Sequence, residues 1–397
     1  MPGLLVLMGS GETSPTMVEI HRAAARTLRA GARAVLLDTP YAFQENRADI
    51  SARACRYFAH SVGLDVEVAA AITGADWVFS GPGSPTYALD RWADSGVAGD
   101  LRARVRAREG VTVLASAAAC TAGLATVPVY EIYKVGAEPA WREGIDLLEA
   151  LGLQAVLIPH FDNAEGGTHD TRYCYLGESR LSRMERDLPP GTAVLGLDEH
   201  TALVIDLESE SVRVAGRGGL TVRRPGTLTV LPAGTHTDLA ELRRLAEGRA
   251  GTPAPPQPSS SPETALSEVT LEESIRSCEE SFKAAAAGPD MVAAAQAVLD
   301  LEVELVKWAA DTEEDSGGVE QARELMRLLI ARLGELASTA SQHSQDLPAL
   351  VLPLLALRAE LRGKGCYDVA DALREAMARG GVMVEDTPDG PRWTSVS

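Results

Sequence analysis

Residues 251–262 are predicted to be a linker between domains of this chain of 397 residues. The segment reads Gly-Thr-Pro-Ala-Pro-Pro-Gln-Pro-Ser-Ser-Ser-Pro and contains five prolines but no large apolar side chain. It cannot bury enough apolar area to offset the entropy of ordering it, and its prolines favour extended chain. We therefore expect a linker over residues 237–263, with one domain over 1–236 and further domains after it.

Residues 1–236 alternate short apolar runs with helical patterns, such as those at Glu19–Arg29 and Asp49–Val62. Continuous apolar strands joined by helices are typical of a parallel sheet with both faces covered. Short strands between residues 201 and 230 then predict a β-meander. We expect an α/β fold in which helices sandwich a mostly parallel sheet. Its strands are predicted at Leu4–Met8, Ala34–Leu37, Trp77–Phe79, Val111–Leu114, Ala155–Ile158 and Ala193–Gly196.

Residues 264–397 have the apolar spacing of amphipathic helices. We expect an all-α bundle over 264–344 and a separate module with a small tail over 345–397. A strand-like run at Gly381–Val384 belongs to that tail. Helices are predicted at Thr270–Ala287, Met291–Asp311, Val319–Thr339 and Leu347–Arg379, the last broken at Gly363-Lys364-Gly365.

The charge balance restricts the partners of this chain. Lys and Arg number 37 against 56 Asp and Glu, which gives a net charge of −19. Such a field repels phosphate and disfavours non-specific binding to nucleic acids or anionic membranes. The five cysteines are scattered and form no Cys-x-x-Cys pair, which favours a reducing compartment. With no apolar run long enough to cross a bilayer, we expect a cytoplasmic protein without membrane contact.

Three polar segments follow predicted strands. Ser116 stands among alanines where a buried strand turns into a helix, a pattern that suits a nucleophile elbow but also an ordinary close-packed helix start. His160 begins a loop rich in ionisable residues, and Glu199 lies in a third segment. Because parallel sheets build their sites at the carboxyl ends of strands, these side chains are expected to meet. A carboxylate is what a general-base histidine needs to fix its tautomer.

The same segments resemble the peptidase E and cyanophycinase family over residues 1–232. The similar stretches are Pro-His-Phe-Asp-Asn-Ala-Glu-Gly-Gly-Thr-His-Asp-Thr-Arg at 159–172, Gly-Leu-Asp-Glu at 196–199 and Arg-Gly-Gly at 217–219. The resemblance implies a flavodoxin-like sheet of the class I glutamine amidotransferase type and hydrolysis of a peptide, amide or ester bond. It implies Ser116 as nucleophile, His160 as base and Glu199 as orienting acid, with no metal and no cofactor.

The resemblance also implies groups that bind the substrate and the oxyanion. These are Gly81, Gly83, Ala117, Asn163, His169 and Arg172, and Arg172 would suit an acidic substrate. Leu114 and Ala118 replace the glycines usual at the elbow, and Pro82 lacks an N–H. A catalytically degenerate binding module on the same fold therefore remains the alternative.

The end of the chain resembles a different family, the cysteinyl-tRNA synthetases. The similar stretches are Leu355–Arg362, Tyr367–Arg374 and Gly381–Trp393 within residues 264–397, and neither His-Ile-Gly-His nor Lys-Met-Ser-Lys-Ser occurs anywhere. The resemblance implies tRNA contact without synthetase catalysis. Arg392 and Trp393 are the candidates, since an arginine plane and an indole can stack on unpaired bases. A scaffold for homodimerisation or domain packing is the alternative.

Overall fold

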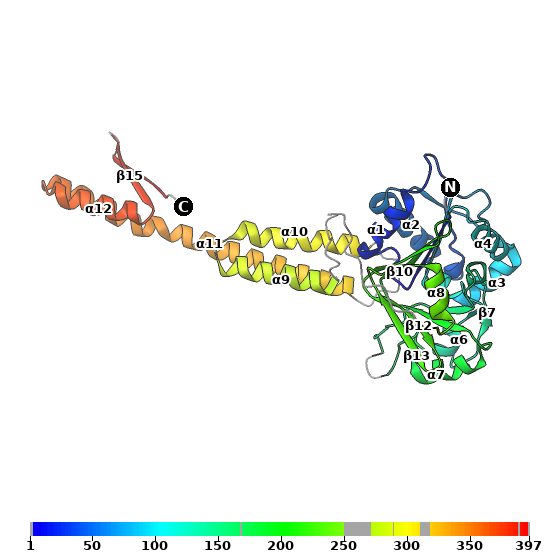
Figure 1. Cartoon of the computed structure of the whole chain (residues 1–397). Helices are drawn as coiled ribbons and strands as arrows, with labels where there is room; N and C mark the ends of the chain where they lie inside the picture. Colours follow the sequence, from blue (N-terminus) through cyan, green and yellow to red (C-terminus); the bar gives the residue numbers. More distant parts are fainter. Residues whose placement is uncertain are drawn as a thin grey trace. The chain divides into compact units, whose positions relative to one another are not determined.

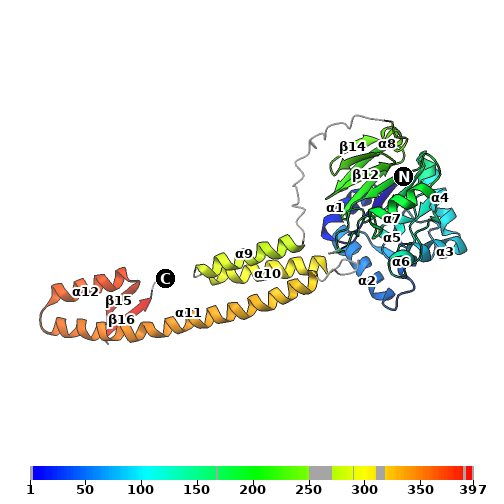
Figure 2. The same ribbon diagram turned by 90° about the horizontal axis from the view of Figure 1, so that it is seen from below.

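The computed structural model describes residues 3–166, 169–249, 271–288, 290–309, 318–387 and 390–395, and the side chains of all of these except 339–349. Residues 251–262, where we expect a linker, lie outside this part of the chain. The chain divides into two compact units. One consists of Met1–Ser274 with Glu302–Ala322, and the other of Ile275–Leu301 with Arg323–Ser397. Figures 1 and 2 show the elements of each unit.

An eight-stranded sheet forms the centre of the first unit. The pairs from β1 through β5, β4 and β2 to β3 are parallel, but the pairs from β1 through β10 and β11 to β14 are antiparallel. The sheet is therefore mixed, and the predicted parallel pairing is found in its half from β1 to β3. In spatial order its strands are β14 (His236–Asp238), β11 (Ser211–Gly216), β10 (Thr201–Asp206), β1 (Leu4–Met8), β5 (Val111–Ala115), β4 (Trp77–Ser80), β2 (Ala34–Leu36) and β3 (Val66–Val68).

A second sheet has four strands in the order β13 (Thr227–Pro232), β12 (Gly219–Arg224), β9 (Ala193–Leu197) and β8 (Ala155–Ile158). The expected β-meander is thus divided, since β10 and β11 pair in the large sheet while β12 and β13 pair in this one. The chain changes sheets at Gly216–Gly219, where Gly216 has a φ of +111° and a Cβ on Gly218 would lie 2.4 Å from Cβ of Asp198. Glycine permits both the dihedral angle and the close approach.

Apolar side chains bury both faces of the large sheet. Along β1, Leu5 and Leu7 enter one core cluster and Val6 and Met8 enter another, as the alternation of a strand requires. The helices of this unit are α1 (Val18–Ala25), α2 (Arg47–Tyr57), α3 (Pro85–Ser95), α4 (Val97–Arg106), α5 (Ser116–Cys120), α6 (Val129–Tyr133), α7 (Gly177–Met184) and α8 (Leu239–Ala246).

Several short elements complete the first unit. Strand β14 and helix α8 occupy residues 236–246, so this part of the expected linker is folded, with Leu239 and Leu242 in the core. The remaining elements are the antiparallel pair of β6 (Ala125–Thr126) and β7 (Arg142–Glu143), the 3₁₀ helices η1 (Pro15–Met17), η2 (Thr39–Tyr41), η4 (Leu148–Leu151) and η5 (Glu185–Asp187), and the π-helical turn η3 (Phe58–Val62).

Helices dominate the C-terminal region. They are α9 (Leu271–Ala287), α10 (Met291–Trp308), α11 (Gly318–Gly363) and α12 (Tyr367–Arg379), followed by the hairpin of β15 (Val382–Thr387) and β16 (Gly390–Ser395) (Figure 2). The predicted break at 363–365 is present, and Gly365 there has a φ of +75°. The helices predicted separately before it are one continuous helix, and the expected single strand is a hairpin. Within the described residues, no helix is both long and apolar enough to cross a membrane.

Candidate active site

Ser116 occupies a sharp turn between β5 and α5. Ala115 is extended, with φ −129° and ψ 154°, and Ser116 then has a φ of +47°. A positive φ costs a residue with a Cβ about 1 kcal/mol or more and is concentrated at functional turns. The serine is largely buried, with 8% of its surface exposed. The turn therefore has the backbone geometry of a nucleophile elbow, which the apolar strand before it and the small residues after it permit.

Ser116, His160 and Glu199 form a continuous chain of hydrogen bonds. The Ser116 hydroxyl lies 2.9 Å from Nε2 of His160, and Nδ1 of the same ring lies 2.9 Å from Oε1 of Glu199. His160 follows β8 and Glu199 follows β9, so the ends of two neighbouring parallel strands supply the histidine and the carboxylate. The structure thus brings together the three side chains that the sequence singles out.

Two further side chains hold Glu199 in place. Asn163 donates from Nδ2 to Oε1 of Glu199 at 3.0 Å, and the backbone N–H of Glu199 donates to Oδ1 of Asp162 at 2.7 Å. Burial by itself would raise the pKa of Glu199, but the hydrogen bond and charge of His160 and the Asn163 amide outweigh it and lower that pKa. Glu199 is therefore ionised and accepts a hydrogen bond from Nδ1 of His160. Asn163 was expected to bind substrate, whereas Asp162 was missed because acidic loop residues carry no distinctive pattern.

The residues at the two positions where the resemblance implies elbow glycines are part of the core. Leu114 and Ala118 are fully buried, and both belong to the core cluster beneath the turn. The backbone N–H of Ala118 donates to the carbonyl of Gly81 at 3.2 Å, which brings the loop of Gly81 and Gly83 against the serine turn. Gly83 has a φ of +128°, and a Cβ there would lie 2.2 Å from the carbonyl oxygen of Pro40. Only glycine fits that position.

A left-handed turn follows the histidine loop. Tyr173, Cys174 and Tyr175 have φ values of +63°, +54° and +64°. The N–H of Cys174 donates to the carbonyl of His160 at 3.1 Å, and the N–H of Tyr173 donates to the carbonyl of Phe161 at 3.0 Å. The turn therefore anchors the backbone of His160.

The same turn supplies an aromatic wall beside the histidine. The Tyr175 ring lies 6.3 Å from the His160 ring and 4.9 Å from the Tyr133 ring. The Tyr175 hydroxyl donates to Oε2 of Glu165 at 2.8 Å. His169, expected to contact substrate, lies 3.4 Å from the Tyr133 hydroxyl through Nε2 and has no hydrogen bond to Ser116 among the described contacts.

Arg172 does not present a free positive charge to the site. Its Nε and Nη2 donate to the two carboxylate oxygens of Asp170 at 2.8 and 2.9 Å, and its guanidinium lies 5.0 Å from the centre of the Tyr173 ring. The Arg172 guanidinium in turn holds the pKa of Asp170 well below its usual range. An acidic substrate group would have to compete with Asp170 for this arginine.

The two candidate tRNA contacts lie on β16 and differ in environment. Arg392 is exposed and stands opposite Glu385 in the hairpin register. Trp393 packs against a small core of Val351, Leu355, Met377 and Val382, so its indole has a structural role. The hairpin is fixed by Arg358, whose Nη1 and Nη2 donate to the two carboxylate oxygens of Asp386 at 2.6 and 2.8 Å.

Comparison with known proteins identifies the end of the chain. Residues 344–393 match the cysteinyl-tRNA ligase anticodon binding domain. The cysteine–tRNA ligase of Deinococcus radiodurans is 40% identical over 65 residues, which are 16% of this chain and 13% of that ligase. The enzyme of Carboxydothermus hydrogenoformans is 38% identical over 52 residues, 13% of this chain and 11% of that ligase. The resemblance of this segment is confirmed, and the chain spans about an eighth of the ligases it matches.

Two solved structures are similar to more than half of the chain. A peptidase from an acI-B1 Actinobacterium has 19% sequence identity and a TM-score of 0.45, covering 60% of this chain and 97% of that one. A protein assigned as a peptidase E from Listeria monocytogenes EGD-e has 13% identity and a TM-score of 0.38, covering 58% of this chain and 99% of that one.

Proposed function

We propose that this chain is a serine-dependent hydrolase of an amide, peptide or ester bond. The observation that supports the proposal is the hydrogen-bonded chain from Ser116 through His160 to Glu199, with 2.9 Å at each step. A serine on a positive-φ turn, a histidine and an ionised carboxylate in this order are the components of nucleophilic acyl transfer.

Each residue of this chain of contacts takes part in the proposed reaction. Ser116 attacks the carbonyl carbon while its proton moves to Nε2 of His160, and Glu199 stabilises the imidazolium through Nδ1. The N–H groups of Gly83 and Ala117 donate to the oxyanion. His160 then returns the proton to the leaving group, and a water molecule activated by the same ring hydrolyses the acyl-enzyme.

The bidentate pairing of Arg172 with Asp170 limits the expected substrates. Moving the guanidinium to an acidic side chain of the substrate would break the two hydrogen bonds that it makes with Asp170. We therefore expect poor turnover of simple Asp-dipeptides. Substrates with a neutral side chain in place of the aspartate should be turned over better. A series of dipeptides that differ only in an Asp or Asn residue measures this preference, and efficient cleavage of the Asp member would contradict it.

A fluorophosphonate probe tests the nucleophile without knowledge of the substrate. Wild type should be labelled, Ser116→Ala should not, and His160→Ala should react far more slowly, because triad members act as a unit. Ser95→Ala is the matched control, since Ser95 is exposed and bonds only to the carbonyl of Arg91 among its described contacts. Equal labelling of wild type and Ser116→Ala would refute the assignment of Ser116 as the nucleophile. A folded wild type that resists labelling would favour the degenerate binding module.

The family match over residues 344–393 favours a second, RNA-binding function. We propose that this segment contacts tRNA, with Arg392 as one phosphate or base contact. Gel shifts with tRNA for cysteine and with other tRNAs, at two salt concentrations, test this. Arg392→Gln should weaken binding, while Lys283→Gln on α9 should not. Absence of any complex at low salt would leave the segment as a scaffold.

The two proposed functions together favour a substrate linked to cysteine or its tRNA. An aminoacyl ester carried on tRNA contains a bond that an acyl-transfer site can hydrolyse, and binding of the tRNA would raise its local concentration near the serine. The half-life of cysteinyl-tRNA should fall in the presence of wild type but not of Ser116→Ala. An unchanged half-life with a protein that still reacts with the probe would reject this substrate and keep the hydrolase.

A further inference from the structure

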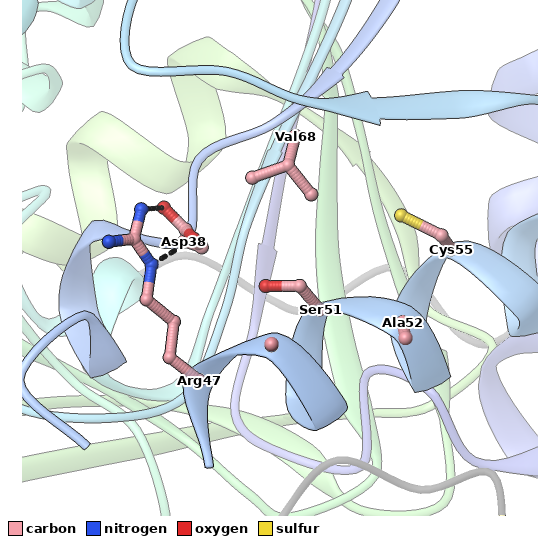
Figure 3. Close-up of a pocket in the computed structure, with 7 residues that line it drawn as sticks. Asp38, Arg47, Ser51, Ala52, Cys55 and Val68 are labelled. Carbon is pink, nitrogen blue, oxygen red and sulfur yellow. Dashed lines mark hydrogen bonds and ion pairs between the residues drawn. The ribbon is translucent and has the colours of Figure 1, made fainter. Parts of the chain in front are cut away.

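Two apolar surfaces of the described residues share no side chain with the serine site. One is a pocket of about 410 Å³ beside α2, lined by alanines, Val68 and a few polar side chains. Figure 3 shows the carboxylate of Asp38 between the guanidinium of Arg47 and this pocket, and the two groups are paired with each other. The charge of the arginine is thus turned away from the pocket, and its lining does not indicate a class of ligand. The other surface is one face of α10, drawn in yellow in Figure 1.

Helix α10 (Met291–Trp308) is apolar around most of its circumference. Its polar residues are Gln296, Asp300, Glu302, Glu304 and Lys307. One side of the helix is buried within the chain, and the buried side chains there are Ala294, Ala297, Val298, Leu301, Leu305 and Trp308. A helix with apolar residues on all sides is normally buried on all sides. We therefore expect the opposite side of α10 to be covered as well.

The opposite side of α10 has the spacing of a coiled-coil seam. Its exposed apolar residues are Val292, Leu299, Val303 and Val306, with exposed fractions of 81%, 57%, 48% and 58%. Together with Gln296, which is also exposed, they follow one another at alternating steps of four and three residues. This spacing places Gln296 and Val303 at the a positions of a heptad and the other three residues at the d positions. These five residues, here called the α10 seam, extend over about 21 Å of helix.

We infer that the α10 seam binds the α10 seam of a second copy of this chain, with the two helices parallel. The charges beside the seam are complementary in that arrangement. Glu302 is at a g position and Lys307 is at the e position five residues later, so Glu302 of each copy faces Lys307 of the other. Within one copy, Lys307 donates to Oε1 of Glu304 at 2.5 Å, and 52% of its side chain is exposed. Its ammonium group has two further donors for the carboxylate of the second copy.

Gln296 favours the parallel orientation of the two helices. In a parallel pair the a positions face each other, and two amides can bond because each has both a donor and an acceptor. Within one copy, Nε2 of Gln296 donates to Oδ1 of Asp300 at 2.9 Å, and its Oε1 can accept from the amide of the second copy. In an antiparallel pair an a position faces a d position, so the amide would lie against an apolar side chain without a partner. The g positions would then face each other, and Glu302 would lose its contact with Lys307.

Sedimentation velocity of the full chain measures this association without substrate or tRNA, so the result does not depend on either proposed function. The seam is short, but α10 is already folded in a single copy, and we expect a dissociation constant on the order of 10 μM. About four fifths of the chains should then be dimers at about 100 μM, and about a seventh at about 1 μM. A wild type that stays monomeric at the higher concentration would refute the inference.

A charge within the seam tests which face is used. Leu299→Glu places a carboxylate at the central d position and should raise the dissociation constant more than about a hundredfold, with the helix content unchanged in circular dichroism. Leu352→Glu on α11 is the matched control, because 58% of Leu352 is exposed and this residue is not part of the seam. The control should dimerise like wild type. Equal association of Leu299→Glu and wild type would refute the role of the α10 seam.

Exchange of the flanking charges tests the orientation. Glu302→Lys sets two positive charges against each other in a parallel pair and should raise the dissociation constant roughly tenfold at low ionic strength. The double variant Glu302→Lys with Lys307→Glu restores the attraction with the signs reversed, so its association should return to that of wild type. Failure of the double variant to recover would refute the parallel pairing.

Discussion

Acidification from pH 8 to pH 5 is expected to destabilise the first unit through the buried imidazole of His21. The side chain is fully buried on α1, and its Nε2 donates to the backbone carbonyl of Glu12 at 2.7 Å. Within the described part of the chain, Nδ1 has no hydrogen-bond partner. Phe58, Tyr57 and Phe79 surround the ring at 5.0, 5.9 and 6.0 Å. A second proton would therefore place a charge in an apolar site.

The size of this loss of stability follows from the pKa of His21. Burial lowers the pKa of His21 from 6.5 to about 4, and the hydrogen bond to Glu12 only partly opposes that effect. Below pH 6.5 the histidine is protonated in the unfolded chain, but in the folded chain it stays neutral until about pH 4. The free energy of unfolding therefore falls as the pH decreases through this window. The linkage gives a loss of roughly 2 kcal/mol at pH 5, approaching about 3 kcal/mol near pH 4.

Urea unfolding at pH 8, 6.5 and 5 measures this loss, with His21→Gln as the test variant. The amide of glutamine can still donate to the Glu12 carbonyl but does not titrate, so the variant should lack this part of the pH dependence. His60→Gln is the control, because His60 is exposed within η3, away from the buried site of His21, and the variant should keep the wild-type pH dependence. If His21→Gln loses as much stability as wild type between pH 8 and pH 5, the reasoning is refuted.

Three further outcomes are expected. Glu199→Gln should lower kcat/KM about a thousandfold while retaining the fold, because the Nδ1 proton of the histidine loses its ionised acceptor; near wild-type activity would argue against the triad. In thermal unfolding, Asp386→Asn should destabilise the C-terminal hairpin more than Arg358→Met does. The aspartate variant leaves the buried guanidinium of Arg358 without its carboxylate partner. A greater loss of stability in Arg358→Met would contradict this prediction. Burial and the charge of Asp162 raise the pKa of Asp198 to about 6, so its ionisation costs stability as pH rises through that value. Asp198→Asn should therefore gain more stability at pH 7 than at pH 4.5, and an equal gain at both would exclude the effect.

Local pattern predicted most elements of the first unit but not their assembly. The run Leu4–Met8 is a strand with the predicted bounds, because five consecutive apolar residues before a glycine turn leave few alternatives. The direction of pairing could not be read in the same way. Antiparallel pairing of β10 with β1 depends on contacts between residues about 200 positions apart, as in Leu4 with Asp206. Nothing in either strand encodes that choice locally.

The proximity of Ser116, His160 and Glu199 could be predicted from the sequence. A serine, a histidine and a carboxylate each follow a predicted strand, and the carboxyl ends of neighbouring strands lie close together. The charge pairing of Arg172 was not found, although Asp170 stands two residues before it, because sequence does not show whether neighbouring charges turn toward each other. For the same reason, the bidentate contact of Arg47 with Asp38 could not be predicted from the sequence.

The turn at Tyr173–Tyr175 loses stability through its backbone conformation but gains side-chain contacts that glycine could not make. Three successive residues with positive φ sacrifice about 1 kcal/mol or more each relative to glycine, which adopts the same backbone freely. A selection for thermal tolerance alone should therefore enrich glycine here. Replacing Tyr175 in this way would remove the ring next to His160 and the hydroxyl bound to Glu165. Variants selected for heat resistance should consequently divide into those that keep the tyrosine and those that lose the ring beside His160.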